Sequence, residues 1–335
     1  MIDAVATKPH LLDHIAPIWL ALPEEMRATF WVGHRMLVPH ASAHGITATI
    51  GRPHHHGPPV IAANHDDYLQ CHAKRPVIYV EHGAGQSYPG EWADHPSYSG
   101  GRDRERVALF LTLNDTTAER ERAAYPDAAV AVIGSPHLDA LASRVQALRA
   151  APGPGWPSPC PGPVVAFAWH WRCRLLPETM TAFPHWAGAV RTLASSGEWC
   201  VVGHGHPRVF AELVRHYDRM SVPAVGDLAH ALAWADVVAF DNTSAGYEAA
   251  ALGIPVLALN APWYRKHVHH GLRFWDQIPG PEADDPERLA DALRDALDPA
   301  WEPRRREVAD RVYPPALRGR SAALAAAAIC ERWSR

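Results

Sequence analysis

Hydrophobic residues in the first part of the chain fall into short continuous runs separated by segments compatible with helices. Continuous apolar runs of this length predict strands buried on both faces, as in parallel sheets. Strands that alternate with helical segments in this way predict an α/β domain. The runs are TFWVGH (29–34), GITATIG (45–51), PPVIAANH (58–65), RPVIYVEHG (75–83), VALFLTLN (107–114) and AAVAVIGSPH (128–137).

The same pattern starts again after residue 163, so the second part of the chain predicts another sheet. Its C-terminal segments 286–297 and 304–335 predict amphipathic helices, the latter broken at YPP. Each half is therefore expected to be a Rossmann-like, doubly wound parallel sheet. The second set of strand-like runs is PVVAFAWHW (163–171), EWCVVGHGHP (198–207), DVVAFDN (236–242) and IPVLALN (254–260).

A proline- and glycine-rich segment, APGPGWPSPCPGP (151–163), separates the two halves and excludes a helix or a central strand. It predicts a linker between an N-terminal domain, 1–150, and a C-terminal domain, 164–310. The last helix, 311–335, is expected to return to the first domain. Ligands of open α/β sheets bind beyond the carboxyl ends of the strands, so we expect the site in a cleft that both domains face.

Composition adds few constraints. The 32 basic and 36 acidic residues give a net charge of −4, which provides no global reason to expect nucleic-acid binding. No run of about 18 apolar residues occurs, so no integral membrane association is expected. The five cysteines are scattered without a C-x-x-C pair, which predicts reduced thiols and a cytoplasmic location. Oligomeric state stays open.

A histidine follows the strand VIYVE in the loop HGAGQS (82–87). The loop glycines Gly83 and Gly85 would let backbone amides approach a ligand, and His82 is a candidate general base. The alternative is a tight turn. In the second half, HGHPR (204–208) places His206 and Arg208 after a strand, where arginine can hold phosphate through charge-assisted bonds. Its alternative is a surface turn.

The strand DVVAF ends on Asp241, Asn242, Thr243 and Ser244, immediately before a short predicted helix. Hydroxyl groups, free amides and the helix dipole all favour an anion at such a position, so a phosphate group is the expected ligand. Glu248 lies one turn further along among apolar neighbours. A carboxylate there could accept hydrogen bonds from sugar hydroxyls, and its alternative is an ordinary solvated residue.

Two histidine-rich segments, 54–56 and 267–270, raise the question of a metal. Adjacent histidines on proline-flanked loops seldom converge on one ion, and no H-x-x-x-H pair with a nearby acid completes a site, so no metal is expected. The segment WYRKHVHHG instead makes Arg265 and Lys266 candidates for contacts with an acceptor or a phosphate, with a plain surface loop as the alternative.

Several motifs carry a resemblance to GT-B glycosyltransferases. ADVVAFDNTSAGYEAAALGIPVLALN (235–260) is similar to their donor-site segment, and DNTS with HGHPR most resembles the CDP-glycerol glycerophosphotransferase branch. VEHGAGQSY looks like that branch's H-G-x-x loop. VIGSPHLDAL resembles a G-x-P-x-x-D-x-L segment shared with nonhydrolysing UDP-N-acetylglucosamine 2-epimerases. The resemblance implies a GT-B-like fold of two Rossmann-like domains, the second of which binds a nucleotide donor.

Carried onto this chain, the resemblance implies His82 as catalytic base, His206 and Arg208 on the donor diphosphate, Thr243 and Ser244 with Asn242 at the phosphates, and Glu248 on the ribose. The sequence therefore predicts a metal-independent transferase without a cofactor. It would move a glycosyl or polyol-phosphate group from a nucleotide-activated donor to a hydroxyl acceptor: a glycan, a polymer, a metabolite or modified DNA. The alternatives are a UDP-sugar 2-epimerase and a non-catalytic nucleotide-sugar or glycan binder. Thr243-Ser244-Ala245 replaces the epimerases' Ser-Gly-Gly helix start, which favours transfer.

Overall fold

The computed structural model describes residues 1–54, 56–71, 74–84, 106–151, 161–172, 177, 180–264 and 278–334. These residues form two compact units. The first holds the described parts of Met1–Gly83, Gly90–Ala140 and Tyr313–Arg335, and the second holds those of Ala84–Pro89 and Leu141–Val312. The division falls between Ala140 and Leu141 rather than at residue 151. Residues 152–160 of the expected linker lie outside the described residues, so its linker role stays a prediction.

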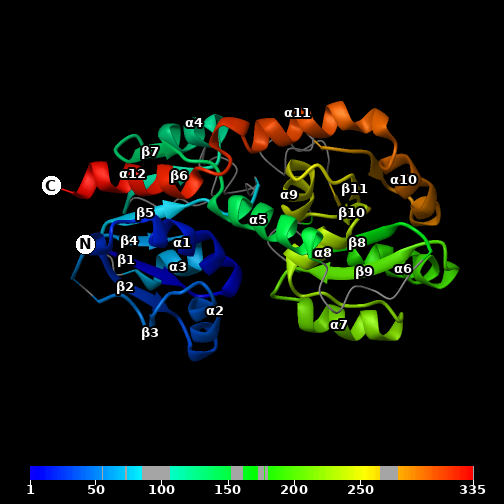
Figure 1. Ribbon diagram of the computed structural model, residues 1–335, viewed down its shortest axis with the longest axis horizontal. Coiled ribbons are helices and arrows are strands. Elements are labelled where there is room, and N and C mark those ends of the chain that lie inside the picture. The colour runs from blue at the N-terminus through cyan, green and yellow to red at the C-terminus, as the bar shows by residue number, and fades with distance from the viewer. Residues whose placement is uncertain are drawn as a thin grey trace. The chain divides into compact units, whose positions relative to one another are not determined.

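The first unit is built on a seven-stranded parallel sheet in the order β3-β2-β1-β4-β5-β6-β7. Figure 1 shows its strands with their covering helices. Its strands are β1 (Ile2–Ala6), β2 (Arg27–Val32), β3 (Ala48–Ile50), β4 (Val60–Ala62), β5 (Val77–Val80), β6 (Val107–Thr112) and β7 (Ala129–Val132). Its helices are α1 (Pro9–Ala21), α2 (Val38–Ala43), α3 (His65–Gln70), α4 (Asp115–Ala124), the start of α5 (Pro136–Ala150) and α12 (Ser321–Trp333).

The second unit is built on a five-stranded parallel sheet in the order β12-β11-β10-β8-β9. Its strands are β8 (Val164–Trp169), β9 (Cys200–Gly205), β10 (Val237–Phe240), β11 (Val256–Leu259) and β12 (Glu282–Ala283). Besides the rest of α5, its helices are α6 (Phe183–Ser196), α7 (Phe210–Arg219), α8 (Leu228–Trp234), α9 (Ala245–Ala251), α10 (Leu289–Ala296) and α11 (Glu302–Val312). Two α/β domains with parallel sheets are thus confirmed.

One central strand, β1, was not predicted from the sequence. All five of its residues are buried, although the second is an acid. Asp3 is tolerated because it forms an ion pair with Arg75, Nη2 to Oδ2 at 2.5 Å, and both side chains are buried. Its other oxygen accepts a hydrogen bond from the backbone amide of Thr29 at 2.9 Å. Breaking such a buried pair would leave an uncompensated charge in the core.

The C-terminal helix α12 packs on α1 in the first unit (Figure 1). Ala325 and Ile329 are fully buried in the same apolar cluster as Ile15 of α1. Asp139 at the start of α5 holds the segment before α12, because its carboxylate accepts hydrogen bonds from the amides of Gly319 at 2.7 Å and Ser321 at 3.0 Å. The aspartate of the G-x-P-x-x-D-x-L motif therefore has a structural contact in this chain.

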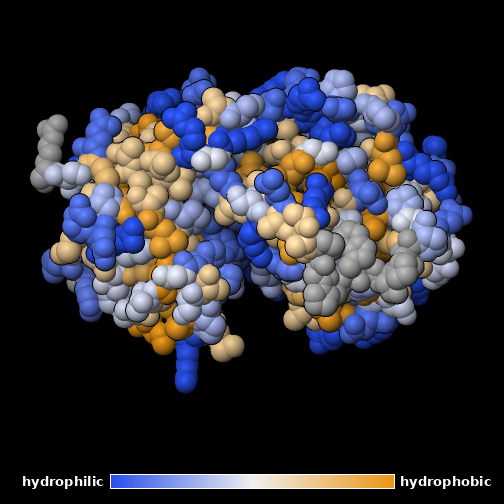
Figure 2. Space-filling model, in the orientation of Figure 1, coloured by the Kyte–Doolittle hydropathy of each residue, from blue (hydrophilic) through white to orange (hydrophobic). Residues whose placement is uncertain are grey.

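The surface of the second unit is strongly polar over α11, where Figure 2 shows hydrophilic residues along the helix. Ion pairs four residues apart, Glu302 with Arg306 and Glu307 with Arg311, line this helix. Such pairs support a helix whose apolar stripe is narrow. No helix within the described ranges is long and apolar enough to cross a membrane.

Among the described cysteines, Cys71 and Cys330 are free thiols, whereas Cys200 is disulfide-bonded. The prediction that all cysteines are reduced is therefore wrong for Cys200. Burial raises the pKa of the Cys71 thiol to about 12, so this thiol stays protonated and unreactive at neutral pH.

Candidate functional site

The candidate site lies at the carboxyl ends of three adjacent strands in the second unit. Strand β8 runs between β10 and β9, with Ala168 opposite Phe240 and Trp169 opposite Gly205. Because all three strands are parallel, the residues that follow them gather at one edge of the sheet. This is the edge at which open α/β sheets bind their ligands.

Asp241 follows β10 and fixes the residues around it. Its Oδ1 accepts a hydrogen bond from the backbone amide of His170 at 2.7 Å. Its Oδ2 accepts from the Thr181 hydroxyl and the Ala182 amide, each at 2.8 Å. The carboxylate is buried, so it orders the end of β8 and the start of α6. Its contacts give this acid a positioning role that the sequence alone did not specify.

His206 and Arg208 follow β9 and lie against the residues that follow β8. The Arg208 guanidinium carbon lies 4.3 Å from the centre of the Trp171 ring, and the Arg208 amide donates to His206 Nδ1 at 3.1 Å. The His206 ring lies 5.8 Å from that of His170. The structure thus brings the two predicted residues His206 and Arg208 together with His170 and Trp171.

The predicted phosphate-binding residues lie at the start of α9. Thr243 and Ser244 are half-buried, whereas Asn242 and Glu248 are buried. The Thr243 hydroxyl is 3.4 Å from the Ala245 amide. Ser244 and Glu248 lie four residues apart and so share one face of the helix. Thr243 and Ser244 are therefore the residues of this set that keep some surface open to solvent.

A glycine lets α9 begin directly against β10. A Cβ placed on Gly246 would lie 2.3 Å from the Phe240 ring, too close for any side chain without a shift. The backbone at the start of α9 is therefore held tightly against the last residue of β10. This contact fixes where Thr243 and Ser244 stand relative to the sheet edge.

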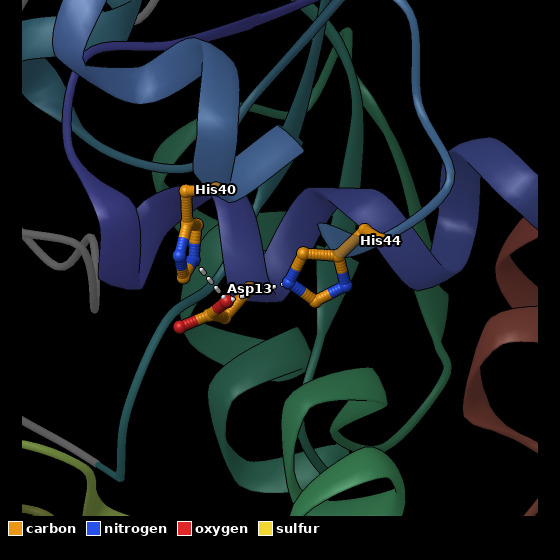
Figure 3. Close-up of side chains that lie close together, drawn as sticks. All are labelled: Asp13, His40 and His44. Atoms are coloured by element: carbon orange, nitrogen blue, oxygen red, sulfur yellow. Dashed lines mark hydrogen bonds and ion pairs between the residues drawn. The ribbon is translucent and has the colours of Figure 1, made fainter. Parts of the chain in front are cut away.

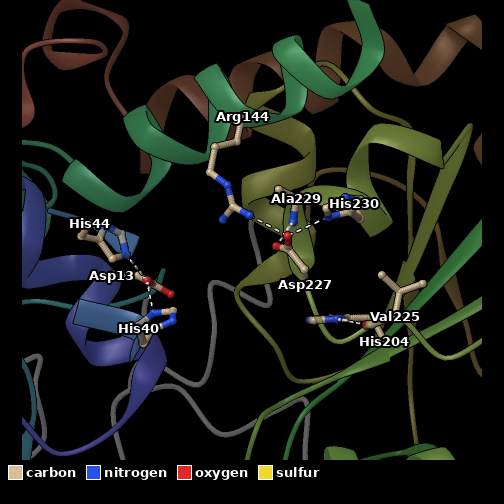
Figure 4. A network of polar contacts seen from close by, with 9 residues as sticks. All are labelled: Asp13, His40, His44, Arg144, His204, Val225, Asp227, Ala229 and His230. Carbon is tan, nitrogen blue, oxygen red and sulfur yellow. Dashed lines mark hydrogen bonds and ion pairs between the residues drawn. The ribbon is translucent and has the colours of Figure 1, made fainter. Parts of the chain in front are cut away.

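Figure 4 shows the contacts of two further polar residues of the second unit, His204 and Asp227. His204 on β9 is buried and shares a hydrogen bond of 2.8 Å with the Val225 carbonyl through Nδ1. Burial lowers the pKa of His204 below its ordinary value of 6.5, although the bond to Val225 and the charge of Asp227 oppose the shift. Asp227 accepts hydrogen bonds from Arg144 at 2.6 Å and pairs with His230 at 2.7 Å.

In the first unit, the predicted base His82 follows β5 and is exposed. Gly83 after it has a φ of +73°, a left-handed conformation that favours glycine. The His82 ring lies 5.9 Å from the ring of His14, which in turn lies 4.6 Å from that of His137. The structure therefore places His82 in a group of imidazoles drawn from three separate segments.

Two buried groups near His82, the His14 imidazole and the Glu81 carboxyl group, have strongly shifted pKa values. Burial lowers the pKa of His14 well below 6.5, and the neighbouring His137 and His82 lower it further. Burial, with the nearby Glu121, raises the pKa of Glu81 well above 4.5. The Leu113 amide donates to Glu81 Oε2 at 3.0 Å. Burial therefore disfavours the charged forms of both His14, whose ring lies beside His82, and Glu81, which precedes it in the chain.

The sequence analysis overlooked a second group in the first unit, formed by Asp13, His40 and His44. Figure 3 shows both imidazoles pointing at one carboxylate oxygen. His40 and His44 are an H-x-x-x-H pair, which could have been noticed, but Asp13 lies too far away in sequence to be paired with them by spacing. Three other predicted contact residues, Gly85, Arg265 and Lys266, lie outside the described residues.

No protein-family model and no curated protein matches the chain by sequence. Solved structures do match. A structure of the wall teichoic acid polymerase TagF (H444N with CDPG) has a TM-score of 0.65 at 14% identity, covering 99% of this chain and 88% of that one. A putative UDP-N-acetylglucosamine 2-epimerase from Listeria monocytogenes has a TM-score of 0.63 at 16% identity, covering 100% and 97%.

A UDP-GlcNAc 2-epimerase from Neisseria meningitidis, solved with bound UDP-GlcNAc, has a TM-score of 0.63 at 13% identity and covers 98% of this chain and 99% of that one. These likenesses show that the fold of this chain is GT-B-like. At such low identity they carry no further conclusion about its chemistry.

Proposed function

We propose that the protein is a transferase that moves a glycosyl or polyol-phosphate group from a nucleotide-activated donor to a hydroxyl acceptor. The observation that carries the proposal is the set of residues gathered at the carboxyl edge of the second sheet. There, Arg208 and His206 meet Trp171 and His170 beside the Asp241 strand end. Arginine, imidazole and hydroxyl groups at such an edge fit the diphosphate of a nucleotide donor.

Each residue of this edge has a proposed role. Arg208 is preordered by stacking on Trp171, so its guanidinium would lose little freedom on binding a phosphate. The hydroxyls of the half-buried Thr243 and Ser244 would bind phosphate oxygens, next to the buried Asn242. Glu248, on the same face as Ser244, would accept hydrogen bonds from the ribose. Because Glu248 is buried, the ribose would have to lie directly against α9 to contact it.

His82 is the proposed general base that removes the proton from the acceptor hydroxyl. It is exposed, as a group that meets an incoming acceptor must be. Negative charge that develops on the departing nucleotide would be stabilised by Arg208 and by the amides and hydroxyls at the start of α9. We therefore propose that no metal ion is needed on the donor phosphates, and that no cofactor takes part.

A second candidate function is epimerisation of a UDP-sugar at carbon 2. It is favoured by the extent of the structural match, because the chain covers 97% and 99% of two epimerases but 88% of the polymerase. An epimerase would convert its nucleotide sugar without any acceptor. Proton NMR of a UDP-sugar incubated with the protein alone would reveal a new anomeric signal.

The proposal is tested by thermal unfolding with CDP-, UDP-, GDP- and dTDP-linked donors. A ligand at 100 times its Kd stabilises the folded state by about 2.7 kcal/mol, so one nucleotide class should raise Tm clearly. Arg208→Ala should abolish most of that rise, whereas Arg219→Ala, at an exposed arginine of α7, should not. If no donor shifts Tm, or if Arg208→Ala responds like the wild type, the donor site is elsewhere or absent. Binding without turnover would favour a non-catalytic nucleotide-sugar binder.

A further inference from the structure

Asp13, His40 and His44 converge from two helices of the first unit (Figure 3). Asp13 lies in α1, His40 lies in α2, and His44 is the residue that ends α2. The Nε2 atoms of His40 and His44 lie 2.7 Å and 2.9 Å from the same oxygen, Oδ1 of Asp13. One ligand atom from each of the three residues lies within 4.8 Å of the other two.

The three side chains already share hydrogen bonds, and the same atoms, two imidazole nitrogens and one carboxylate oxygen, form a set that can bind a metal ion. Zinc-to-ligand bonds of about 2.0–2.2 Å place neighbouring ligand atoms of a tetrahedral site about 3.3 Å apart. The observed separations of 2.7 and 2.9 Å would have to widen by about half an ångström, which small side-chain rotations can supply. The spacing of four residues between His40 and His44 is what places two imidazoles on one side of a helix.

The scaffold around the three side chains is fixed, whereas their tips reach solvent. Leu12 and Ile15 of α1 and Ala41 of α2 are all fully buried. The exposed fractions of the side chains are 24% for Asp13, 35% for His40 and 29% for His44. An ion could therefore enter from water without any rearrangement of the core, and water could fill the coordination positions that the protein leaves open.

We infer that Asp13, His40 and His44 bind a first-row divalent transition-metal ion of the Zn²⁺ type. Two imidazole nitrogens with one carboxylate suit such ions, whereas Mg²⁺ and Ca²⁺ prefer oxygen ligands alone. On binding, each Nε2 gives its lone pair to the metal. A neutral imidazole then carries its proton on Nδ1, and a protonated one releases the extra proton to solvent. The ion ties the six-residue helix α2 to α1.

The first test is a calorimetric titration of EDTA-treated, desalted full-length protein with zinc sulfate at pH 7.5. We expect one zinc site that Asp13→Asn and His44→Gln each weaken at least about tenfold, since even the loss of outer partners of a metal ligand costs that much. The exposed His34 precedes the short 3-10 turn Arg35–Leu37 that leads into α2, so His34→Gln is the matched control and should bind as the wild type does. Absence of zinc binding, or equal affinity in all variants, would overturn the assignment.

The second test needs no substitution, so a misfolded variant cannot confuse it. The wild-type protein is treated with diethyl pyrocarbonate, with and without zinc, and the modified histidines are identified by mass spectrometry. Zinc should slow modification of His40 and His44 while leaving His34 unchanged. If zinc protects neither His40 nor His44, the ion binds elsewhere and the proposal fails. Zinc at 100 times its Kd should also raise Tm by roughly 5 °C in the wild type and not in Asp13→Asn.

Discussion

The carboxylate of Asp241, after β10, accepts a hydrogen bond from the backbone amide of His170, after β8, at 2.7 Å. Its second oxygen accepts from Thr181 and Ala182 at 2.8 Å each. One buried acid thus joins the ends of two strands to the start of α6. The candidate site lies at the ends of these strands. Its geometry therefore depends on the Asp241 hydrogen bonds, although the buried carboxylate itself would not contact a ligand.

Replacement of Asp241 by asparagine should destabilise the second unit. An amide group would turn at least one N–H toward backbone donors and leave a buried polar group unsatisfied, a loss of about 2–3 kcal/mol in the free energy of unfolding. Asp236→Asn is the matched control, because exposed Asp236 makes a single bond to the Val164 amide at 2.8 Å. Urea unfolding measures both. An equal loss in the two variants would contradict the central role of Asp241.

Gly246 and Gly188 form a matched pair of helical glycines. Alanine at Gly246 would press its Cβ against Phe240, whereas a Cβ at Gly188 in α6 meets nothing within 4 Å. Gly246→Ala should therefore lower the free energy of unfolding by about 1–3 kcal/mol. Gly188→Ala should raise it by about 0.5–1 kcal/mol through helix propensity. Thermal unfolding of the two variants measures both changes. If Gly246→Ala leaves the free energy of unfolding unchanged, α9 moves easily away from β10 and the prediction is wrong.

Thr243→Val keeps the shape of the side chain and removes the hydroxyl proposed to bind phosphate. Donor binding should weaken by about 1–3 kcal/mol, since a ligand oxygen loses its partner. Thr192→Val is a suitable control, because the Thr192 hydroxyl donates only to the Gly188 carbonyl on exposed α6. Calorimetry with the donor class found by thermal unfolding gives the affinities. Unchanged binding in Thr243→Val would remove this residue from the site.

His82→Ala should act on turnover rather than on donor binding. His82 belongs to the first unit, and its proposed task is the removal of the acceptor proton. Loss of a general base typically lowers kcat by about 10²- to 10⁴-fold. The donor Kd should stay close to that of the wild type. Normal kcat at saturating donor and acceptor would show that the loop is a structural turn and that the reaction has another base.

His204 should make the second unit less stable in acid. Its pKa is lowered in the folded state, so the folded protein binds fewer protons than the unfolded chain below pH 6.5. The stability that the neutral ring contributes is present above pH 6.5 and is lost as pH falls through the folded-state pKa. His204→Asn keeps a donor for the Val225 carbonyl but cannot titrate. As the pH falls from 7.5 to 5, the wild type should lose free energy of unfolding relative to the variant, so the difference between the two should narrow. A difference that stays constant over this range would contradict this account.

The candidate site was predictable in part. The sequence placed His206, Arg208, Thr243 and Ser244 after strands because polar residues there interrupt apolar runs, and that signal is local. It could not show that Arg208 stacks on Trp171 or that Asp241 points at backbone amides. Those contacts depend on the order β10-β8-β9, which is a property of the whole sheet.

By itself the sequence determined the fold class and most of the strands, because burial on both faces of a parallel sheet leaves a continuous apolar run. Only the tertiary structure revealed β1, since its acid is neutralised by Arg75, far along the chain. Only the tertiary structure joined Asp13 to His40 and His44. A local pattern reports whether a residue faces core or solvent. A buried charge needs a partner. The path of the chain through the fold decides which distant residue supplies that partner, so a local pattern cannot identify it.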